Sequence, residues 1–224
     1  TPRAGIADLA APLRGQRLAV VGAGGTGSFL LDLLIKTPVA EIHVYDGDVL
    51  LSHNAFRAPG ALDIATLRAA PAKANHWANV AAAMRTGVVA HPHYVSEEHV
   101  DELAGYDFVF LAVDDGPARG EIVAALQRVG ASFIDVGMGV DRAGHAGQLL
   151  AAIRTSVSTS QQAAAIPCGT GNDEYGSNIQ VAELNALNAA LAVIAWKRHN
   201  GFYLDATQGT TSIYSTDDNT IAEG

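Results

Sequence analysis

Short apolar runs alternate with longer amphipathic segments through the first two-thirds of the chain. The runs are typical of buried strands, because they are brief, rich in Val, Ile, Phe and Tyr, and often end at glycine or acidic residues. The expected strands are Arg17–Val21, Glu41–Tyr45, Val88–Tyr94, Tyr106–Val113 and Ser132–Val136. The expected helices between them are Ser28–Lys36, Ala69–Arg85 and Glu121–Val129. This alternation predicts βαβ units and a mostly parallel sheet.

The last third of the chain follows a different pattern. Gln148–Arg154 is expected to be a strand, and Thr155–Ser177 is a long loop rich in Ser, Thr, Gln, Gly and Asn. Loops of that length in compact domains are usually functional or disordered. Asn178–His199 is predicted as one long helix that Gly201 caps, and Thr211–Ser215 as a final strand.

Length and composition fit one α/β domain over residues 1–224. We expect a Rossmann-like, mostly parallel sheet in the first half, a mixed or antiparallel continuation in the second half, and helices on both faces. The net charge of −9 argues against a nucleic-acid partner, because phosphate backbones select clustered Lys and Arg. Neither a signal peptide nor a membrane-length apolar run is found, so a cytoplasmic protein without a membrane partner is expected. The chain begins at Thr1 rather than Met, which is compatible with a piece of a longer protein.

The turn after the first predicted strand is a candidate phosphate-binding loop. Gly22, Gly24 and Gly27 satisfy the pattern G-x-G-x-x-G, in which backbone N–H groups and a helix N-terminus approach phosphate oxygens. Asp46 lies 19 residues after Gly27, where it could hold ribose hydroxyls. The pattern alone leaves NAD and ATP open, together with a tight turn that binds nothing.

Polar residues further along favour ATP over NAD. Attack on the α-phosphate of ATP builds charge that Arg, Lys and Mg²⁺ neutralise, and Arg57 and Lys73 follow the second strand. Asp114 comes directly after a strand, at the edge of the sheet where such folds bind ligands, and is the expected Mg²⁺ ligand. Asp115 is the alternative ligand. A NAD enzyme needs an acid or base for hydride transfer, and no candidate is found. No Walker A lysine motif is present.

In order and spacing, these motifs resemble the ThiF / MoeB / ubiquitin-activating E1 adenylyltransferase superfamily. The matching segments are GAGGTGS at 22–28, DGDV at 46–49, NAFR at 54–57, Lys73, and VDD at 113–115 followed by Arg119. The resemblance is clear over residues 17–136 and looser in the last long helix. It implies that nucleotide is bound by Gly22, Gly24, Gly25, Gly27, Asp46, Asp48, Asn54, Arg57 and Lys73. It also implies catalysis by Arg57 and Lys73, with Asp114 holding Mg²⁺.

The family's activity gives a specific functional hypothesis. The resemblance implies ATP-dependent adenylation of the C-terminal carboxylate of a ubiquitin-like protein, for transfer to an E2-like or sulfur-carrier acceptor. It further implies a homodimer in which Arg3 reaches the partner's ATP, and a crossover loop at 155–177. The alternatives are an NAD-dependent Rossmann oxidoreductase and a non-catalytic pseudo-E1 binding module. The intact set of site residues argues against the pseudo-E1.

The sequence departs from the family pattern at three points. Ala58 stands where the family often has glutamine, and no C-x-x-C pairs are present, so a zinc site is not expected. Cys168 is the only cysteine and lies a few residues before the family's thioester position, which falls near Glu174. Cys168 is therefore either a nucleophile or a loop thiol without a role. The acidic Asp173 and Glu174 nearby favour the second interpretation.

Three further groups of residues have no assigned role. The histidine-rich segment is either a metal site or, more simply, a solvated strand end; its members are His91, His93, His99, Glu97 and Glu98. Trp196 and Tyr203 are expected to pack in the core. Three asparagines on the last helix could face the active site, a dimer partner or solvent: Asn178, Asn185 and Asn188.

Overall fold

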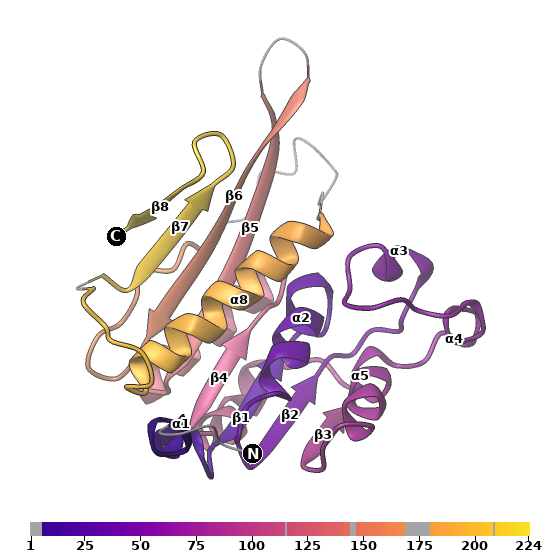
Figure 1. Ribbon diagram of the computed structural model, residues 1–224, viewed down its shortest axis with the longest axis horizontal. Coiled ribbons are helices and arrows are strands. Elements are labelled where there is room, and N and C mark those ends of the chain that lie inside the picture. Colours follow the sequence, from indigo (N-terminus) through magenta and orange to yellow (C-terminus); the bar gives the residue numbers. More distant parts are fainter. Residues whose placement is uncertain (1–5, 115, 144–146, 169–179, 208) are drawn as a thin grey trace.

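The computed structural model describes residues 6–114, 116–143, 147–168, 180–207 and 209–224 (Figure 1). The strands are β1 (Arg17–Val21), β2 (Glu41–Tyr45), β3 (Val88–His91), β4 (Phe108–Leu111), β5 (Phe133–Ala143), β6 (Gln148–Ser158), β7 (Thr211–Ser215) and β8 (Thr220–Glu223). The α-helices are α1 (Ile6–Leu9), α2 (Gly25–Leu34), α3 (Ser52–Ala55), α4 (Ile64–Ala69), α5 (Lys73–Ala82), α6 (Val100–Ala104), α7 (Pro117–Val129) and α8 (Ala182–His199). Single 3₁₀ turns lie at Ala11–Leu13 and Glu97–His99.

The strands form one sheet in the order β3-β2-β1-β4-β5-β6-β7-β8. Strands β1 to β5 are parallel to one another, and β6, β7 and β8 continue the sheet in antiparallel pairing. The chain order reverses between β1 and β4, which are neighbours in the sheet although β2 and β3 separate them in sequence. Such a switch point opens a crevice at the carboxyl ends of the strands, where α/β proteins bind ligands. The predicted fold class is confirmed.

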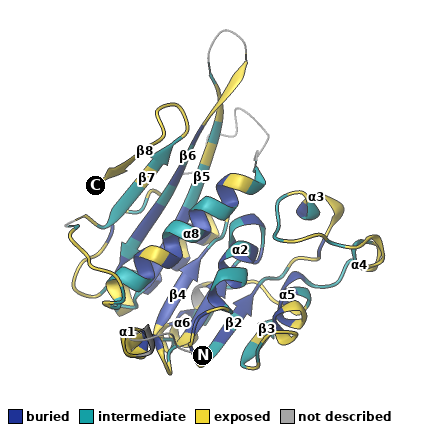
Figure 2. Ribbon diagram, viewed as in Figure 1, coloured by how far each residue is buried: buried dark blue, intermediate teal, exposed yellow. Residues whose placement is uncertain are grey.

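Helices cover both faces of the sheet. On one face α2, α5 and α8 enclose a core that includes Leu30, Trp77 and Trp196. On the other face α6 and α7 pack on the opposite side chains of the same strands, as Leu103 and Leu126 do. Figure 1 shows α8 lying beside α2 across the sheet, and Figure 2 shows that buried residues follow the central strands. The result is a three-layer α/β/α domain.

Several predicted boundaries are confirmed and others are wrong. The bounds of β1, β2 and β7 agree with the prediction. The loop expected from Thr155 begins later, because β6 continues to Ser158. Thr155, Ser156 and Ser158 are buried, and the hydroxyls of Ser156 and Ser158 take part in hydrogen bonds, so polar composition hid the strand. The rest of that expected loop from residue 169 onward, and Asn178, lie outside the described residues.

Other differences have local causes. The helix expected at Ala69–Arg85 is α5 and begins only at Lys73, because Pro71 has no N–H and disfavours a helical residue before it; the preceding helix α4, which ends at Ala69, was not predicted. Trp196 is fully buried as expected, but Tyr203 is 44% exposed. The expectation for Tyr203 was wrong because Gly201, with φ +72°, ends α8 and directs the following residues to the surface. No helix in the described part of the chain combines the length and apolarity needed to cross a membrane.

Candidate active site

The glycine turn occupies the switch point between β1 and β4. Gly22 has φ +90°, and a Cβ there would lie 2.3 Å from the carbonyl oxygen of Ala112 at the end of β4. A Cβ on Gly27 would lie 1.8 Å from the carbonyl oxygen of Gly22. Both positions therefore require glycine, for conformation at the first and for space at both. Helix α2 begins at Gly25, so its N-terminal N–H groups lie at the turn.

Asp46 ties the turn to the end of β2. Its Oδ2 accepts from the backbone N–H of Ala23 at 2.7 Å, and its Oδ1 accepts from that of Asp48 at 2.8 Å. A carboxylate has about four lone-pair sites, so acceptor capacity is left for ribose hydroxyls. The position predicted from sequence is thus adjacent to the turn.

Lys73 is buried and paired, rather than being a solvated surface charge. Its side chain is 9% exposed, and Nζ donates to Oδ2 of the half-exposed Asp48 at 2.8 Å. The hydrogen bonds from Lys73 and then from Tyr94 hold the pKa of Asp48 below its usual range. A lysine ammonium carries three donors, so Lys73 can bind Asp48 and a phosphate oxygen together.

Five buried side-chain nitrogens have no partner among the described residues, and two of them belong to residues that the sequence predicts for the site. These two are Nδ2 of Asn54, on α3, and Nε of Arg57; the others are on His76, Trp77 and Arg198. Asn54 is oriented by its other amide atom, Oδ1, which accepts from the N–H of Leu51 at 2.8 Å. Buried donors are normally satisfied, and leaving one unpaired costs about 1–3 kcal/mol, so these two point to a missing acceptor such as a phosphate oxygen.

Asn185 and Gln180, which have no role assigned from the sequence, connect Arg57 and Asp114 to the glycine turn. Asn185 on α8 donates from Nδ2 to the backbone oxygen of Arg57 at 3.4 Å and contacts Gly25. Gln180 donates to Oδ1 of the exposed Asp114 at 3.2 Å, and its own Oε1 lies against Gly25. Through these two side chains, Arg57 and Asp114 are both connected to Gly25 of the glycine turn. Only tertiary contacts could identify Asn185 and Gln180.

Asp114 fits the role of a magnesium ligand in a nucleotide complex. Mg²⁺ is commonly held by one or two carboxylates together with substrate phosphates. Within the described ranges, no group of three or more His, Cys, Asp or Glu could hold a metal ion. A metal at Asp114 would therefore depend on nucleotide oxygens for the rest of its coordination. Asp115 and Arg3, which were also considered for the site, lie outside the described residues.

A second charged cluster lies between α7, β5 and β6. Asp135 is fully buried and accepts from Arg119 at 2.9 and 2.6 Å and from Arg154 at 2.8 Å. Gly137 makes room for the guanidinium of Arg154, since a Cβ on Gly137 would lie 2.8 Å from its Nη2. Arg119 belongs to the motif recognised in the sequence, whereas Asp135 and Arg154 were not singled out.

Cys168 lies close to this cluster but in an unremarkable environment. Arg119 donates from Nη1 to the carbonyl oxygen of Pro167 at 3.0 Å, which holds the loop against α7. Cys168 is exposed, and its Sγ lies 3.4 Å from the carbonyl oxygen of Ile166. A carbonyl oxygen can accept from a thiol S–H but does not stabilise a thiolate. The guanidinium nearby already binds Asp135.

The histidine-rich segment forms a packed aromatic cluster. His91 stacks on Tyr45 with ring centroids 4.1 Å apart, and its Nε2 lies 2.9 Å from Nδ1 of His43. His93 stacks on His99 at 4.9 Å. Burial lowers the pKa of His91, which favours the neutral ring. His91 and His99 are half-buried in these stacks, whereas His93 and Glu98 are exposed, as the expected solvated strand end requires.

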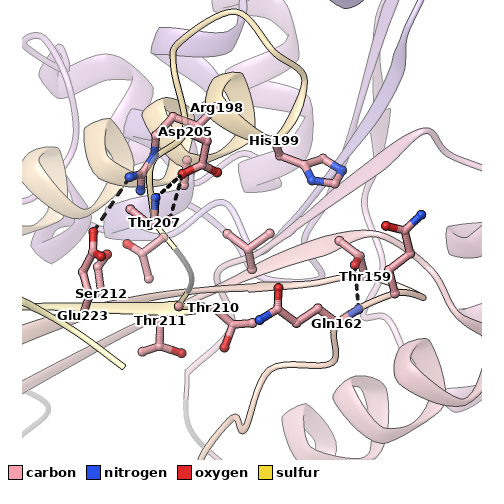
Figure 3. Close-up of a pocket in the computed structure, with 15 residues that line it drawn as sticks. Thr159, Gln162, Arg198, His199, Asp205, Thr207, Thr210, Thr211, Ser212 and Glu223 are labelled. Carbon is pink, nitrogen blue, oxygen red and sulfur yellow. Dashed lines mark hydrogen bonds and ion pairs between the residues drawn. The ribbon is translucent and has the colours of Figure 1, made fainter.

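A polar cavity of about 190 Å³ lies toward the amino ends of the parallel strands, away from the glycine turn (Figure 3). Its walls come from the end of β6, the end of α8 and the segment leading into β7, with Arg198, His199 and Asp205 among them. Since β6 runs antiparallel to β5, Ser158 pairs with Phe133 at the amino end of β5. The cavity is therefore remote from the glycine turn and is not the nucleotide site.

Fold and site together define a Rossmann-like nucleotide-binding domain, in which Asn185 and Gln180 connect the glycine turn to Arg57 and Asp114, and Asp48 pairs with Lys73. The ThiF family model matches residues 5–195, and the chain belongs to the ThiF family. No curated protein sequence matches.

Solved structures share the fold at low sequence identity. The structure of E. coli MccB with ATP is 14% identical with a TM-score of 0.75, covering 96% of this chain and 65% of that one. MccB with MccA is 13% identical with a TM-score of 0.73, covering 97% and 66%. PaaA is 16% identical with a TM-score of 0.71, covering 96% and 65%. The chain therefore spans about two-thirds of the length of these neighbours.

Proposed function

We propose that the chain binds ATP at the glycine turn and uses it to adenylate a polypeptide's C-terminal carboxylate. The observation that carries the proposal is the contact network around one turn. Asp48 holds Lys73 on one side, Asn185 reaches the backbone of Arg57, and Gln180 bridges to Asp114. Family membership and a neighbour solved with ATP support ATP over NAD.

The chemistry requires charge neutralisation more than proton transfer. A carboxylate oxygen attacks the α-phosphorus, the bond from that phosphorus to the bridging oxygen breaks, and pyrophosphate leaves. A C-terminal carboxyl has a pKa of about 3.5, so it is ionised at neutral pH and needs no general base. The unpaired donors of Asn54 and Arg57, with Lys73, would bind the phosphate oxygens. Asp114 would hold Mg²⁺, whose positive charge would neutralise the negative charge that develops on the departing pyrophosphate.

The finer proposals come from the resemblance to E1 enzymes. The substrate would be the tail of a ubiquitin-like protein, and an E2-like or sulfur-carrier acceptor would receive the acyl group. The chain would act in the cytoplasm as a homodimer, with Arg3 of each subunit reaching the nucleotide bound by the other. The part of the expected crossover loop that follows β6, up to residue 177, would cross over the tail of the substrate protein. Recovery of activity on mixing Arg3→Ala with Asp114→Asn protein would support action in trans. No recovery despite subunit exchange would count against it.

ATP–pyrophosphate exchange tests the proposed reaction directly. We expect exchange of labelled pyrophosphate into ATP that depends on an added ubiquitin-like protein ending in a free carboxylate. The same protein with an amidated C-terminus is the control and should support no exchange. A thermal shift with ATP·Mg²⁺ but not with NAD is expected beforehand. Stabilisation by NAD alone would favour the oxidoreductase alternative, and ATP binding without exchange would favour the pseudo-E1.

Cys168 is proposed not to carry the acyl group. Its Sγ contacts a carbonyl oxygen, which does not stabilise a thiolate, and the nearby guanidinium of Arg119 is already bound to Asp135 and to the carbonyl oxygen of Pro167. We expect Cys168→Ala to retain both exchange and transfer to the acceptor, the two being assayed separately. Complete loss of transfer with intact exchange would show instead that Cys168 forms a thioester.

A further inference from the structure

Asn185 occupies a position from which it contacts both sides of the glycine turn. Its Oδ1 accepts from the hydroxyl of Thr26 at 3.0 Å, within the first turn of α2. Its Nδ2 donates to the backbone oxygen of Arg57 at 3.4 Å. The residue is 1% exposed, so both halves of the amide are committed to these contacts without competition from water. One side chain thus connects α2, which begins at the turn, to the stretch between α3 and α4 that carries Arg57, here called the Arg57 segment.

The same side chain explains why Gly25 is a glycine. A Cβ on Gly25 would lie 2.2 Å from Nδ2 of Asn185, whereas a Cβ on Gly24 would meet nothing within 4 Å. Gly25 also has no φ in the left-handed range, so space rather than backbone conformation excludes other residues. The extra glycine in GAGGTGS, beyond the G-x-G-x-x-G pattern, therefore accommodates a side chain from α8.

Asn188 provides an internal comparison on the same helix. It is also 1% exposed, and it also uses both amide atoms: Oδ1 accepts from Thr155 at 3.2 Å and Nδ2 donates to the backbone oxygen of Gly137 at 3.0 Å. These contacts attach α8 to β5 and β6 and do not involve the glycine turn. The two asparagines thus have equal burial and two side-chain hydrogen bonds each, and differ in which parts of the structure they connect.

We propose that Asn185 is a positioning residue of the nucleotide site, which sets the spacing between the glycine turn and the Arg57 segment. The inference rests on the proposed function, since it assumes that phosphate lies between those two parts. Asn185 itself would not contact the reacting atoms. Its loss would let α2 and the Arg57 segment move relative to each other, so that donors from both no longer reach the same phosphates.

Direct titration of ATP·Mg²⁺ into Asn185→Ala and Asn188→Ala proteins tests this role. Each variant loses both hydrogen bonds of one buried amide, so we expect comparable losses in melting temperature. The dissociation constant for ATP is expected to rise roughly tenfold in Asn185→Ala and to stay within about twofold of wild type in Asn188→Ala. In the exchange assay the KM for ATP should rise in the first variant, while the KM for the carboxylate substrate is unchanged.

Two further variants keep the test decisive if Asn185→Ala folds poorly. Thr26→Val removes one of the two contacts of Asn185 and is expected to weaken ATP binding by less than Asn185→Ala does. In the double variant Thr26→Val with Asn185→Ala, the two effects are expected to be non-additive. Asn185→Asp keeps the acceptor for Thr26 but places a carboxylate oxygen against the backbone oxygen of Arg57, and is expected to weaken binding. Equal ATP affinity in the Asn185 variants and wild type, or equal weakening in the Asn185 and Asn188 variants, would overturn the inference alone. Failure of the wild-type protein to bind ATP would overturn the proposed function and the inference together.

Discussion

Two groups of charged residues lie near the carboxyl ends of the parallel strands, and they are built differently. Around the glycine turn, Asp48 is half-exposed, Asp114 is exposed, and buried donors of Asn54 and Arg57 have no partner among the described residues. Between α7, β5 and β6, Asp135 is fully buried and accepts from two arginines. The first arrangement is incomplete in the way that a binding site is, whereas the second is satisfied internally. The comparison shows that a charged cluster can be purely structural, since the buried charges of Asp135, Arg119 and Arg154 neutralise one another.

Asp135→Asn should produce the largest effect of the variants considered, as a loss in the free energy of unfolding. Removing the carboxylate leaves Arg119 and Arg154 facing each other with little compensation, and breaking a buried pair in this way costs about 3–5 kcal/mol. Urea denaturation at neutral pH would measure the loss of unfolding free energy. The control replaces all three residues, as Arg119→Met, Asp135→Leu and Arg154→Met, and should recover much of the loss. A change below about 1 kcal/mol in Asp135→Asn would contradict the structural assignment.

Asp114→Asn should affect catalysis and leave stability alone. Asp114 is exposed, so the melting temperature should not change, but exchange should fall about 100-fold because the amide lacks the charge that binds Mg²⁺. Asp141→Asn, which alters an exposed carboxylate on β5, is the matched control and should retain full activity. Asp115→Asn identifies the alternative ligand. A wild-type rate in Asp114→Asn would remove this residue from the proposed site.

The smallest expected effect concerns the pH dependence of the Asp48–Lys73 pair. Hydrogen bonds from Lys73 and Tyr94 lower the pKa of Asp48 in the folded state. A lowered carboxyl pKa gives stability that is fully present above the unfolded value, near 4, and is lost as pH falls through the folded value. Wild-type stability should therefore fall more steeply below about pH 4 than that of Asp48→Asn. The difference should stay under about 1 kcal/mol because Asp48 is half-exposed. Parallel urea-denaturation profiles from pH 6 to 3 would show that the pair contributes nothing.

Features encoded by local sequence were predicted well, and features that depend on distant contacts were not. The glycine turn and the strands β1 and β2 follow from short patterns, so their positions were confirmed. Strand β8 was missed because all four of its residues are exposed, which leaves no alternation of apolar and polar positions to detect.

The site itself shows the same division. Asp46, Lys73 and Asp114 were predicted from motif spacing; in the structure Asp46 binds the N–H of Ala23 in the turn, Asp114 is linked to it through Gln180, and Lys73 pairs with Asp48. Asn185 and Gln180 were not assigned, because their roles depend on α8 packing against α2, more than 150 residues away in the case of Thr26 and Asn185. Neither an asparagine on a helix nor a glutamine just before one carries a local signal that distinguishes such contacts from solvent exposure.

The order of strands in the sheet has a consequence for how the chain reaches its native state. Strands β5 and β6 pair over eleven residues each as close neighbours in sequence, from Ala143 with Gln148 outward. Pairing β1 with β4 instead joins segments about 90 residues apart, as the bond from Arg17 to Asp107 does. Because closing a longer loop costs more entropy, we expect the hairpin to form early and the β1–β4 junction late. The glycine turn lies at that junction and is completed by α8, so the ability to bind ATP would be among the last properties that a refolding chain regains.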